Sequence, residues 1–182
     1  MQNLKLLKSE KRYAGRVFDL IVDELEYPSG NRTVREVASH PGGAVIVPLI
    51  DDNTLLLIHQ FRYPMKEELF EFPAGKLNEG EDPEECARRE LSEETGYAAG
   101  AMKYLGRIYT SPGFCSEILH LFFATGLSRT AEGPQLEEGE SGLIVEPTAV
   151  ASVAAMIESG TIVDAKTICG FHLAMNTMWN HK

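Results

Sequence analysis

Short stretches of alternating or continuous apolar residues run through the first two thirds of the chain and predict a series of β-strands. Residues 16–26 and 32–39 flank the turn signal YPSGN, which predicts an N-terminal β-hairpin. The HPGG break at 40–43 separates this hairpin from the rest of the chain. Further strands are predicted at 44–50, 55–61, 68–72, 102–110 and 117–125.

The clearest helix signal lies between these strands, from Pro83 to Thr95. Asp82 is a good N-cap and Pro83 suits the first helical position, while Glu85 completes a capping box. Gly96 is placed to end the helix in a left-handed conformation. These residues predict both ends of the helix from local chemistry alone.

Two more helices are predicted near the end of the chain. One runs from Pro147 to Glu158 and is closed by Ser159 and Gly160; the other follows an Asp164 N-cap and ends near Trp179. Strands and helices therefore alternate, but without the regular period of a doubly wound fold. The pattern alone predicts only a mixed α and β protein.

Composition and charge limit the classes of function. The chain has 182 residues, 43% of them hydrophobic, which is enough for one well-packed domain. Its net charge of −10 and pI near 5.0 argue against general affinity for nucleic acid or for anionic membranes. A phosphate-bearing ligand would then depend on a few placed cations and on metal.

The chain shows no signal-peptide core and no apolar run of about 18 residues, so we expect a cytoplasmic protein without a membrane span. Cys86, Cys115 and Cys169 are odd in number and scattered, without the paired spacing of a metal site. We interpret them as reduced thiols with structural roles.

The predicted helix at 83–95 carries an unusual cluster of acids near its C-terminal end. At about 100° per residue, Glu90, Glu93 and Glu94 project from one face. Like charges at this spacing, beside the negative end of the helix dipole, destabilise a helix by about 0.3 to 1 kcal/mol per charge. Either this face is simply solvated or a bound divalent cation offsets the repulsion. Carboxylate oxygens without His or Cys favour Mg²⁺ first and Mn²⁺ second, and disfavour Zn²⁺.

The spacing of residues around this helix resembles the signature of Nudix hydrolases. The match departs only at the last position, where Tyr97 replaces an aliphatic residue. The matching residues are Gly75, Glu81, Arg89, Glu90, Leu91, Glu93, Glu94 and Gly96.

The resemblance implies a fold, a division of the chain and a metal site. The implied fold is an α/β Nudix-type α/β/α sandwich with a mixed sheet, formed by residues 42–182. Residues 1–41 would be a small N-terminal β extension that serves dimerisation and substrate contacts. The implied metal ligands are Glu90, Glu94 and the main-chain carbonyl of Ala74. Glu93 and Glu81 are supporting candidates, and Arg89 resembles an orienting salt-bridge partner.

Hydrolysis also needs a general base, and a carboxylate already bound to metal is a poor one. The Gly-rich, acidic stretch GPQLEEGESG at 133–142 is a candidate mobile loop or else a solvated surface loop. In the ADP-ribose pyrophosphatase branch of the family, a loop here carries two glutamates matched by Glu138 and Glu140. That resemblance implies Glu138 as the base and Glu140 as a further metal ligand, with Glu93 as the next candidate base.

Several segments outside the signature are similar to the branch that hydrolyses ADP-ribose and other nucleoside diphosphate sugars. They are REVASHPGGAV, HQFRYP, EFPAGKL and TSPGFCSE, the last containing Pro112 and Gly113. The resemblance implies Mg²⁺-dependent cleavage of the pyrophosphate bond, with Mn²⁺ as a possible substitute, and a homodimer whose N-terminal hairpin reaches the partner's site. Two alternatives remain open: another Nudix substrate such as a nucleoside triphosphate or an RNA 5′ end, or a nucleotide sensor without catalysis.

The candidate substrate contacts each have a chemical rationale. Arg62 and Arg35 offer planar guanidinium groups to a phosphate, or else form ordinary surface salt bridges. Pro112 and Gly113 would form a rigid turn whose backbone approaches the ligand. The remaining candidates are Glu117, as an acceptor for ribose or backbone groups, and Phe18, which could stack on a base or lie in a core or dimer interface.

Overall fold

The computed structural model describes residues 3–136 and 138–179 and divides into two compact units. The first unit combines the chain up to Gly42 with Tyr109–Ile118, and the second takes in Gly43–Ile108 and the chain from Leu119 onward. The excursion at 109–118 therefore belongs with the N-terminal strands, although the sequence division at residues 41 and 42 did not include it.

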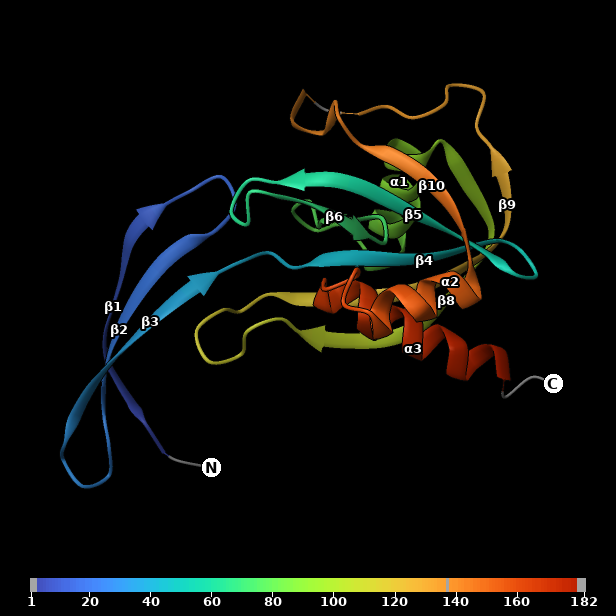
Figure 1. The fold of residues 1–182 in the computed structure, drawn as a ribbon. Helices are drawn as coiled ribbons and strands as arrows, with labels where there is room; N and C mark the ends of the chain where they lie inside the picture. The colour runs from blue at the N-terminus through green and yellow to red at the C-terminus, as the bar shows by residue number, and fades with distance from the viewer. Residues whose placement is uncertain (1–2, 137, 180–182) are drawn as a thin grey trace. The chain divides into compact units, whose positions relative to one another are not determined.

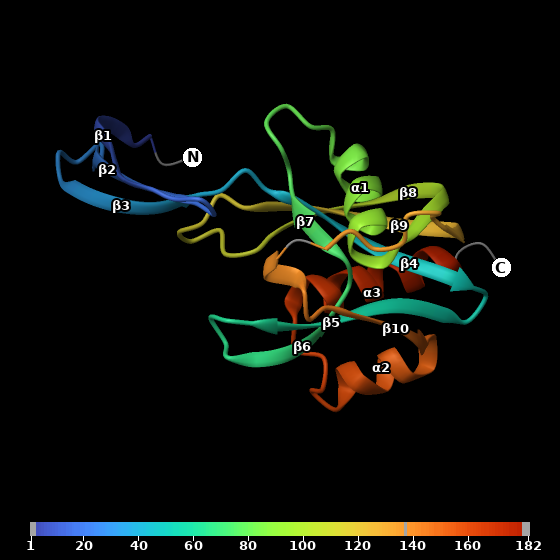
Figure 2. The same cartoon turned by 90° about the horizontal axis from the view of Figure 1, so that it is seen from above.

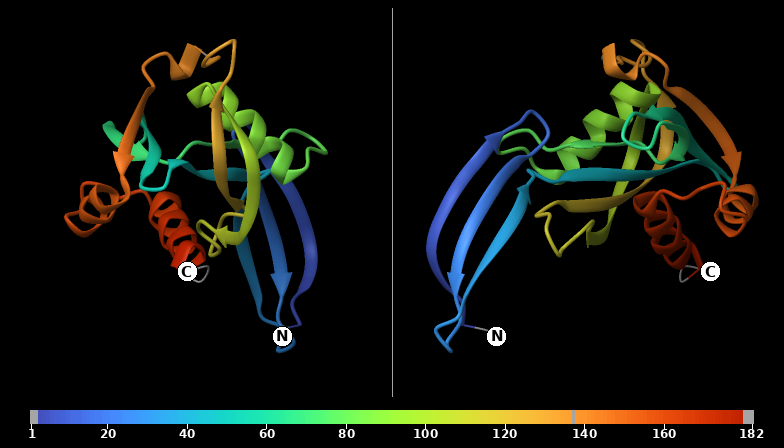
Figure 3. Two further views of the ribbon diagram at one scale, coloured as in Figure 1. Left: turned by 90° about the vertical axis from the view of Figure 1, so that its right-hand side faces the viewer. Right: turned by 60° about the vertical axis from the view of Figure 1, so that its left-hand side comes forward.

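The first unit is built on a three-stranded antiparallel sheet in the order β1-β2-β3 (Figure 3). Its strands are β1 (Lys5–Ala14), β2 (Asp19–Glu26) and β3 (Arg32–Ser39). The excursion joins the end of β3, where the Ala38 N–H donates to the Phe114 carbonyl and the Ser116 N–H donates to the Ala38 carbonyl. The two predicted strands are present, and β1 adds a third. Because β1 is exposed along nearly its whole length, it lacks the apolar alternation that marks a half-buried strand.

The second unit contains a mixed sheet in the order β10-β5-β4-β9-β8, with β6 paired to β5 and β7 paired to β4 (Figure 1). Strands β4 and β9 run parallel, whereas β5 is antiparallel to β4, β6 and β10. The strands are β4 (Gly43–Asp51), β5 (Thr54–Arg62), β6 (Glu67–Glu71), β7 (Ala74–Lys76), β8 (Tyr97–Tyr109), β9 (Ile118–Arg129) and β10 (Ile144–Ala149).

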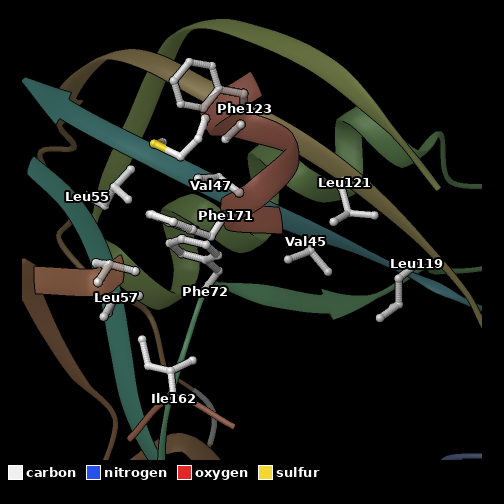
Figure 4. Close-up of a cluster of buried hydrophobic side chains, with 13 residues drawn as sticks. Val45, Val47, Leu55, Leu57, Phe72, Leu119, Leu121, Phe123, Ile162 and Phe171 are labelled. Carbon is white, nitrogen blue, oxygen red and sulfur yellow. The ribbon is translucent and has the colours of Figure 1, made fainter. Parts of the chain in front are cut away.

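Helices cover both faces of this sheet (Figure 2). Ala44 and Ile46 of β4 pack with the buried residues of α1 (Pro83–Thr95) on one face. The alternate β4 residues Val45 and Val47 join the larger cluster on the other face, to which α2 (Val150–Glu158) and α3 (Ala165–Trp179) contribute (Figure 4). This alternation follows from the two-residue period of a strand. The predicted α/β/α sandwich with a mixed sheet is confirmed.

The helix predictions differ in their outcome. The first helix spans Pro83–Thr95 as predicted. The second begins at Val150, so the prediction of a helix start at Pro147 was wrong: Pro147 lies in β10, opposite Leu56 of β5. Strand β10 is an edge strand of the sheet, and an edge strand tolerates a residue that lacks an N–H. Within the described residues, no helix combines the length and the apolar character needed to cross a membrane.

Candidate active site

Helix α1 is held at both ends by the residues that predicted it. The Asp82 side chain accepts a hydrogen bond from the Glu84 N–H at 2.8 Å, and Gly96 adopts the left-handed conformation at φ 71°. A Cβ on residue 96 would also approach Pro134 to 2.8 Å. The loop after β9 therefore packs tightly against the end of α1, and the Gln135 N–H donates to the Glu93 carbonyl at 2.7 Å.

Glu94 is a buried carboxylate on the inner side of α1. It is 2% exposed, and one of its oxygens accepts from the Ala74 N–H at 2.9 Å. The pKa of Glu94 is raised to about 8, mainly by burial and also by the negative charges of Glu90 and Glu140, while the hydrogen bond from Ala74 acts in the opposite direction. Ionised Glu94 is therefore disfavoured where no cation is bound beside it.

Glu90 lies one turn before Glu94 and directly over the Gly75 backbone. A Cβ on residue 75 would lie 1.9 Å from the Glu90 carboxyl group, so only glycine fits there. The requirement for glycine is therefore a matter of space for the carboxylate rather than of backbone conformation. Burial also raises the pKa of Glu90, although its hydrogen bond from Arg89 acts in the opposite direction.

Arg89 binds several acids of the same segment. Its guanidinium donates to Glu81 at 2.9 and 3.0 Å, to Glu90 at 2.6 Å and to Glu93 at 3.0 Å. The hydrogen bonds from Arg89 lower the pKa of Glu81 to about 2. One cation is thus shared among three carboxylates, and Glu94 receives no hydrogen bond from it among the described contacts. The cluster keeps an excess of negative charge.

The segment predicted as a mobile loop contains a short 3₁₀ helix at Glu138–Glu140, and residue 137 lies outside the described residues. The Leu143 N–H donates to the Glu140 carbonyl at 2.8 Å, which closes a turn around this helix. Glu138 is exposed, whereas Glu140 is half-buried and raises the pKa of Glu94. The structure therefore brings Glu140 into the electrostatic field of the α1 acids.

The chemistry of these groups fits a hard divalent cation. The donors are carboxylate and carbonyl oxygens, and the buried Glu94 has two acidic neighbours that act on its pKa. In the part of the chain that the structure describes, no three His, Cys, Asp or Glu side chains are grouped closely enough to hold a metal unaided. Arg89 donates a hydrogen bond to one oxygen of Glu90, so that oxygen is already used within the protein. Main-chain oxygen and oxygen atoms of the substrate would then supply the remaining ligands of a cation.

Arg62 stands at the end of β5 and forms a two-point ion pair with Glu71 of β6. Its Nε and Nη2 atoms each donate to one Glu71 oxygen at 2.7 Å. Lys166 of α3 also donates to Glu71. The structure therefore places Arg62 in a buried salt bridge, and two of its nitrogens are used within the protein.

Sequence reasoning missed Glu71, Lys166 and Gln60. Glu71 is 1% exposed, and Gln60 has a buried side-chain nitrogen without a hydrogen-bond partner among the described residues. A signal was available for Glu71, because this glutamate stands between two phenylalanines at the end of an apolar strand, where a charged side chain needs a partner. Lys166 lies 95 positions further along the chain, and no local pattern connects it to Glu71.

The remaining candidates lie in the first unit. Arg35 donates to Thr33, to the Val34 carbonyl and to the Tyr27 hydroxyl, and Phe18 is exposed. Pro112 and Gly113 form an exposed turn, closed by a hydrogen bond from the Cys115 N–H to the Ser111 carbonyl. The Glu117 carboxylate lies 3.4 Å from the His40 ring.

Comparisons with known proteins identify the family and the fold of the chain. Residues 40–167 match the NUDIX domain. The chain is 40% identical to an ADP-ribose pyrophosphatase of Bacillus subtilis, over 90% of this chain and 88% of that protein. It is 38% identical to a methanol dehydrogenase activator of Bacillus methanolicus, over 98% and 96% of the two chains. A GDP-mannose pyrophosphatase of Yersinia enterocolitica is 36% identical, over 83% and 81%.

A solved structure described as an ADP compounds hydrolase shares the fold, with a TM-score of 0.85 at 23% identity, over 100% of this chain and 97% of that one. The mixed-sheet sandwich and these matches identify the class of the protein as a hydrolase of phosphoanhydride bonds. Within that class, this chain belongs to the Nudix family and is a Nudix pyrophosphohydrolase. Enzymes of this family use divalent cations.

Proposed function

We propose that this enzyme hydrolyses the diphosphate bond of ADP-ribose or a related nucleoside diphosphate sugar, with Mg²⁺ as its cation. The products are a nucleoside monophosphate and a sugar phosphate. The main structural support is Glu94, a buried carboxylate whose neighbours Glu90 and Glu140 add to the negative charge around it. The names of the relatives support the substrate class, since they include ADP-ribose and GDP-mannose pyrophosphatases.

In this proposal, Glu90, Glu94, Glu140 and the Ala74 carbonyl would hold the cation. When bound, a divalent cation neutralises charge on the phosphoryl oxygens and increases the acidity of water. Glu94 is oriented for its role by the Ala74 N–H, and Gly75 leaves the space that Glu90 needs. Arg89 orients the carboxylates of Glu81, Glu90 and Glu93 through its ion pairs.

Glu138 acts as the general base in the proposed reaction, with Glu93 as the next candidate. It accepts a proton from the attacking water while the water oxygen bonds to phosphorus. The bond from that phosphorus to the bridging oxygen then breaks, and its electron pair stays with the departing phosphate. Glu138 is exposed at the start of a short 3₁₀ helix, so it can approach a bound substrate without disturbing the buried acids. Glu93 fits this role less well because Arg89 already donates to it.

The substrate contacts in the first unit complete the proposal. Arg35, Pro112, Gly113, Glu117 and Phe18 would bind the nucleoside or the sugar. We also propose that residues 1–41 mediate a homodimer and that residues 42–182 form the catalytic part. Large apolar side chains of the first unit support a dimer because they are exposed in the single chain, namely Leu6, Tyr13, Val17, Phe18 and Val34. Light scattering checks this assembly, and a monomer at micromolar concentration would contradict it. The free state of all three cysteines supports a cytoplasmic location.

The test of the substrate is a product assay. The enzyme is incubated with ADP-ribose, GDP-mannose, GTP and triphosphorylated RNA, with Mg²⁺ or with a chelator, and the products are identified by mass spectrometry. We expect AMP and ribose phosphate from ADP-ribose, or the matching pair from GDP-mannose, in the presence of Mg²⁺ only. Preferential release of diphosphate from GTP or RNA would instead assign another substrate, and binding without turnover would assign a sensor.

A second candidate function follows from the methanol dehydrogenase activator, because the similarity to that relative extends over 98% of this chain. The candidate activity is stimulation of a methanol dehydrogenase. The assay measures dehydrogenase turnover with the wild-type chain and with the Glu94→Gln variant. Stimulation by the wild-type chain alone would support a role that depends on hydrolysis, whereas an unchanged rate with both would exclude this candidate for the dehydrogenase tested.

A further inference from the structure

The ion-pair cluster around Glu71 is not required by the hydrolytic chemistry itself. Glu71 is 1% exposed, and both of its oxygens are bonded to Arg62 in the planar, two-point geometry that suits a guanidinium. Lys166 donates to the same carboxylate. A carboxylate buried this deeply strongly destabilises the folded protein when it is unpaired, but one cation is enough to neutralise it. The second cation on Glu71 therefore indicates a further role for this cluster.

The cluster continues into α3 and reaches the glycine turn. Lys166 lies 3.0 Å from Asp164, whose side chain also caps the helix by accepting from the Thr167 N–H at 2.9 Å. The Thr167 hydroxyl oxygen accepts from the Phe72 N–H at 2.9 Å. Two residues further on, the Ala74 N–H donates to Glu94. The segment between β6 and β7 is therefore held by α3 on one side and by α1 on the other.

The charges in this cluster are distributed unevenly. Lys166 is the second residue of α3, where the helix dipole disfavours a positive charge. Asp164 occupies the N-cap, where the same dipole favours a negative charge. Lys166 therefore offsets the charge of Glu71, and the helix end offsets part of the charge of Asp164. Among the described ion pairs, Asp164 is bound by Lys166, so the only acid that Arg62 binds is Glu71.

Arg62 directs part of this charge toward the acidic helix. Its side chain is 40% exposed, and Glu94 is one of the groups that raise its pKa, after the hydrogen bond and charge of Glu71. With Nε and Nη2 bonded to Glu71, Nη1 is the remaining nitrogen of the guanidinium, and no described residue accepts a hydrogen bond from it. Arg62 thus presents a fixed cationic edge in the neighbourhood of the carboxylates.

We infer that Glu71 is a positioning residue for the diphosphate: it fixes Arg62 so that Nη1 meets a phosphate oxygen, while Lys166 supplies the charge that keeps Arg62 attractive to an anion. This inference rests on the proposed function and deepens it. An arginine held in this way has already lost its rotamer freedom before substrate arrives, so less binding energy is lost in ordering it. Glu71 touches neither substrate nor cation in this role and acts only through Arg62.

A double-mutant cycle separates positioning from a merely structural role. The variants are Arg62→Ala, Glu71→Gln and their combination, and the measurements are kcat and KM for the substrate found in the product assay. Glu71→Gln alone is expected to reduce kcat/KM by about tenfold to a hundredfold, mainly through KM, because Arg62 loses its orientation. In the Arg62→Ala background the same change is expected to have no further effect. An equal loss in both backgrounds would overturn the inference.

Chemical rescue gives a second readout that a structural role does not produce. Millimolar guanidinium is expected to restore part of the activity of Arg62→Ala, because Glu71 and Lys166 still form a binding site for the ion. No restoration is expected in the double variant, and rescue of both variants alike would contradict the role of Glu71. Circular dichroism and unfolding temperatures confirm that each variant is folded, and Glu71→Asp, which keeps the charge, serves where Glu71→Gln does not fold.

The matched control is Glu84→Gln, which removes an Arg88–Glu84 pair with a 2.8 Å contact at the exposed start of α1. This variant is expected to keep wild-type kcat and KM. A wild-type protein without turnover on any nucleoside diphosphate sugar would overturn both the proposed function and this inference. Normal turnover combined with independent effects at positions 62 and 71 would overturn the inference alone.

Discussion

Two arginines of the second unit, Arg89 and Arg62, bind acids in surroundings that differ in their balance of charge. Arg89 shares its guanidinium among Glu81, Glu90 and Glu93, so negative charge remains in excess beside the buried Glu94.

Arg62 instead shares Glu71 with Lys166, and Lys166 also pairs with Asp164, so two cations face two acids and no excess of negative charge remains. The same residue types therefore build complementary half-sites, one suited to a cation and the other to a phosphate. The ratio of cations to acids, rather than the presence of a salt bridge, decides which ligand each can attract.

The largest expected effect is on the acidic cluster formed by Glu90, Glu94 and Glu140. Glu94→Gln keeps the shape of the side chain and its contact with Ala74 but removes the charge. We expect metal-dependent turnover to fall by about a thousandfold or more, because the cation supplies several kcal/mol of charge stabilisation. Calorimetry with Mn²⁺ and a turnover assay measure the change. Near-normal activity would refute the assignment of Glu94 as a ligand.

Glu138→Gln tests whether the base is separate from the anionic cluster. Turnover is expected to fall by about a hundredfold or more, because a general base contributes that much, while KM changes little. Steady-state kinetics at saturating Mg²⁺ distinguish the two parameters. An unchanged kcat would transfer the role to Glu93, and the same measurement on Glu93→Gln would then show the loss.

Lys166→Met tests the ion-pair cluster around Glu71 by its effect on the stability of the protein. Removing one partner of a buried pair leaves the charge of Glu71 less compensated, so we expect a loss of about 3 kcal/mol in the free energy of unfolding. Urea denaturation measures it. The control is Arg88→Met, which breaks the exposed pair with Glu84 and is expected to change stability by about 0.5 kcal/mol or less. Equal losses in the two variants would mean that Lys166 is an ordinary surface cation.

The smallest expected effect is on the stability of the protein at low pH, when the ion pair between Arg89 and Glu81 is removed. Because the pKa of Glu81 is lowered from 4.5 to about 2, the unfolded chain binds a proton there at a higher pH than the folded protein does. The stabilisation is complete above the unfolded pKa and is lost as the pH falls from about 4.5 toward 2. Glu81→Gln should therefore show a shallower fall in unfolding temperature across this window. Parallel curves for the two proteins would contradict the pairing with Arg89.

Some features could be predicted because the determining contacts lie within a few residues of one another. Asp82 and Gly96 specify the ends of α1, and both act over a single helical turn. The same locality explains the pairing of Arg89, since Glu93 lies one turn further along the helix. The prediction of a helix start at Pro147 failed because pairing with β5, more than 80 positions earlier in the sequence, outweighs the local signal.

The sequence by itself determined the acidic helix, its boundaries and the family of the chain, because spacing along one helix converts directly into proximity. Only the tertiary structure decided that Arg62 is bonded to Glu71, that Lys166 joins them and that Glu140 acts on Glu94. These groups come from separate strands and helices, and burial makes their pairing obligatory. No periodicity within any one segment encodes which distant charge will compensate a buried one.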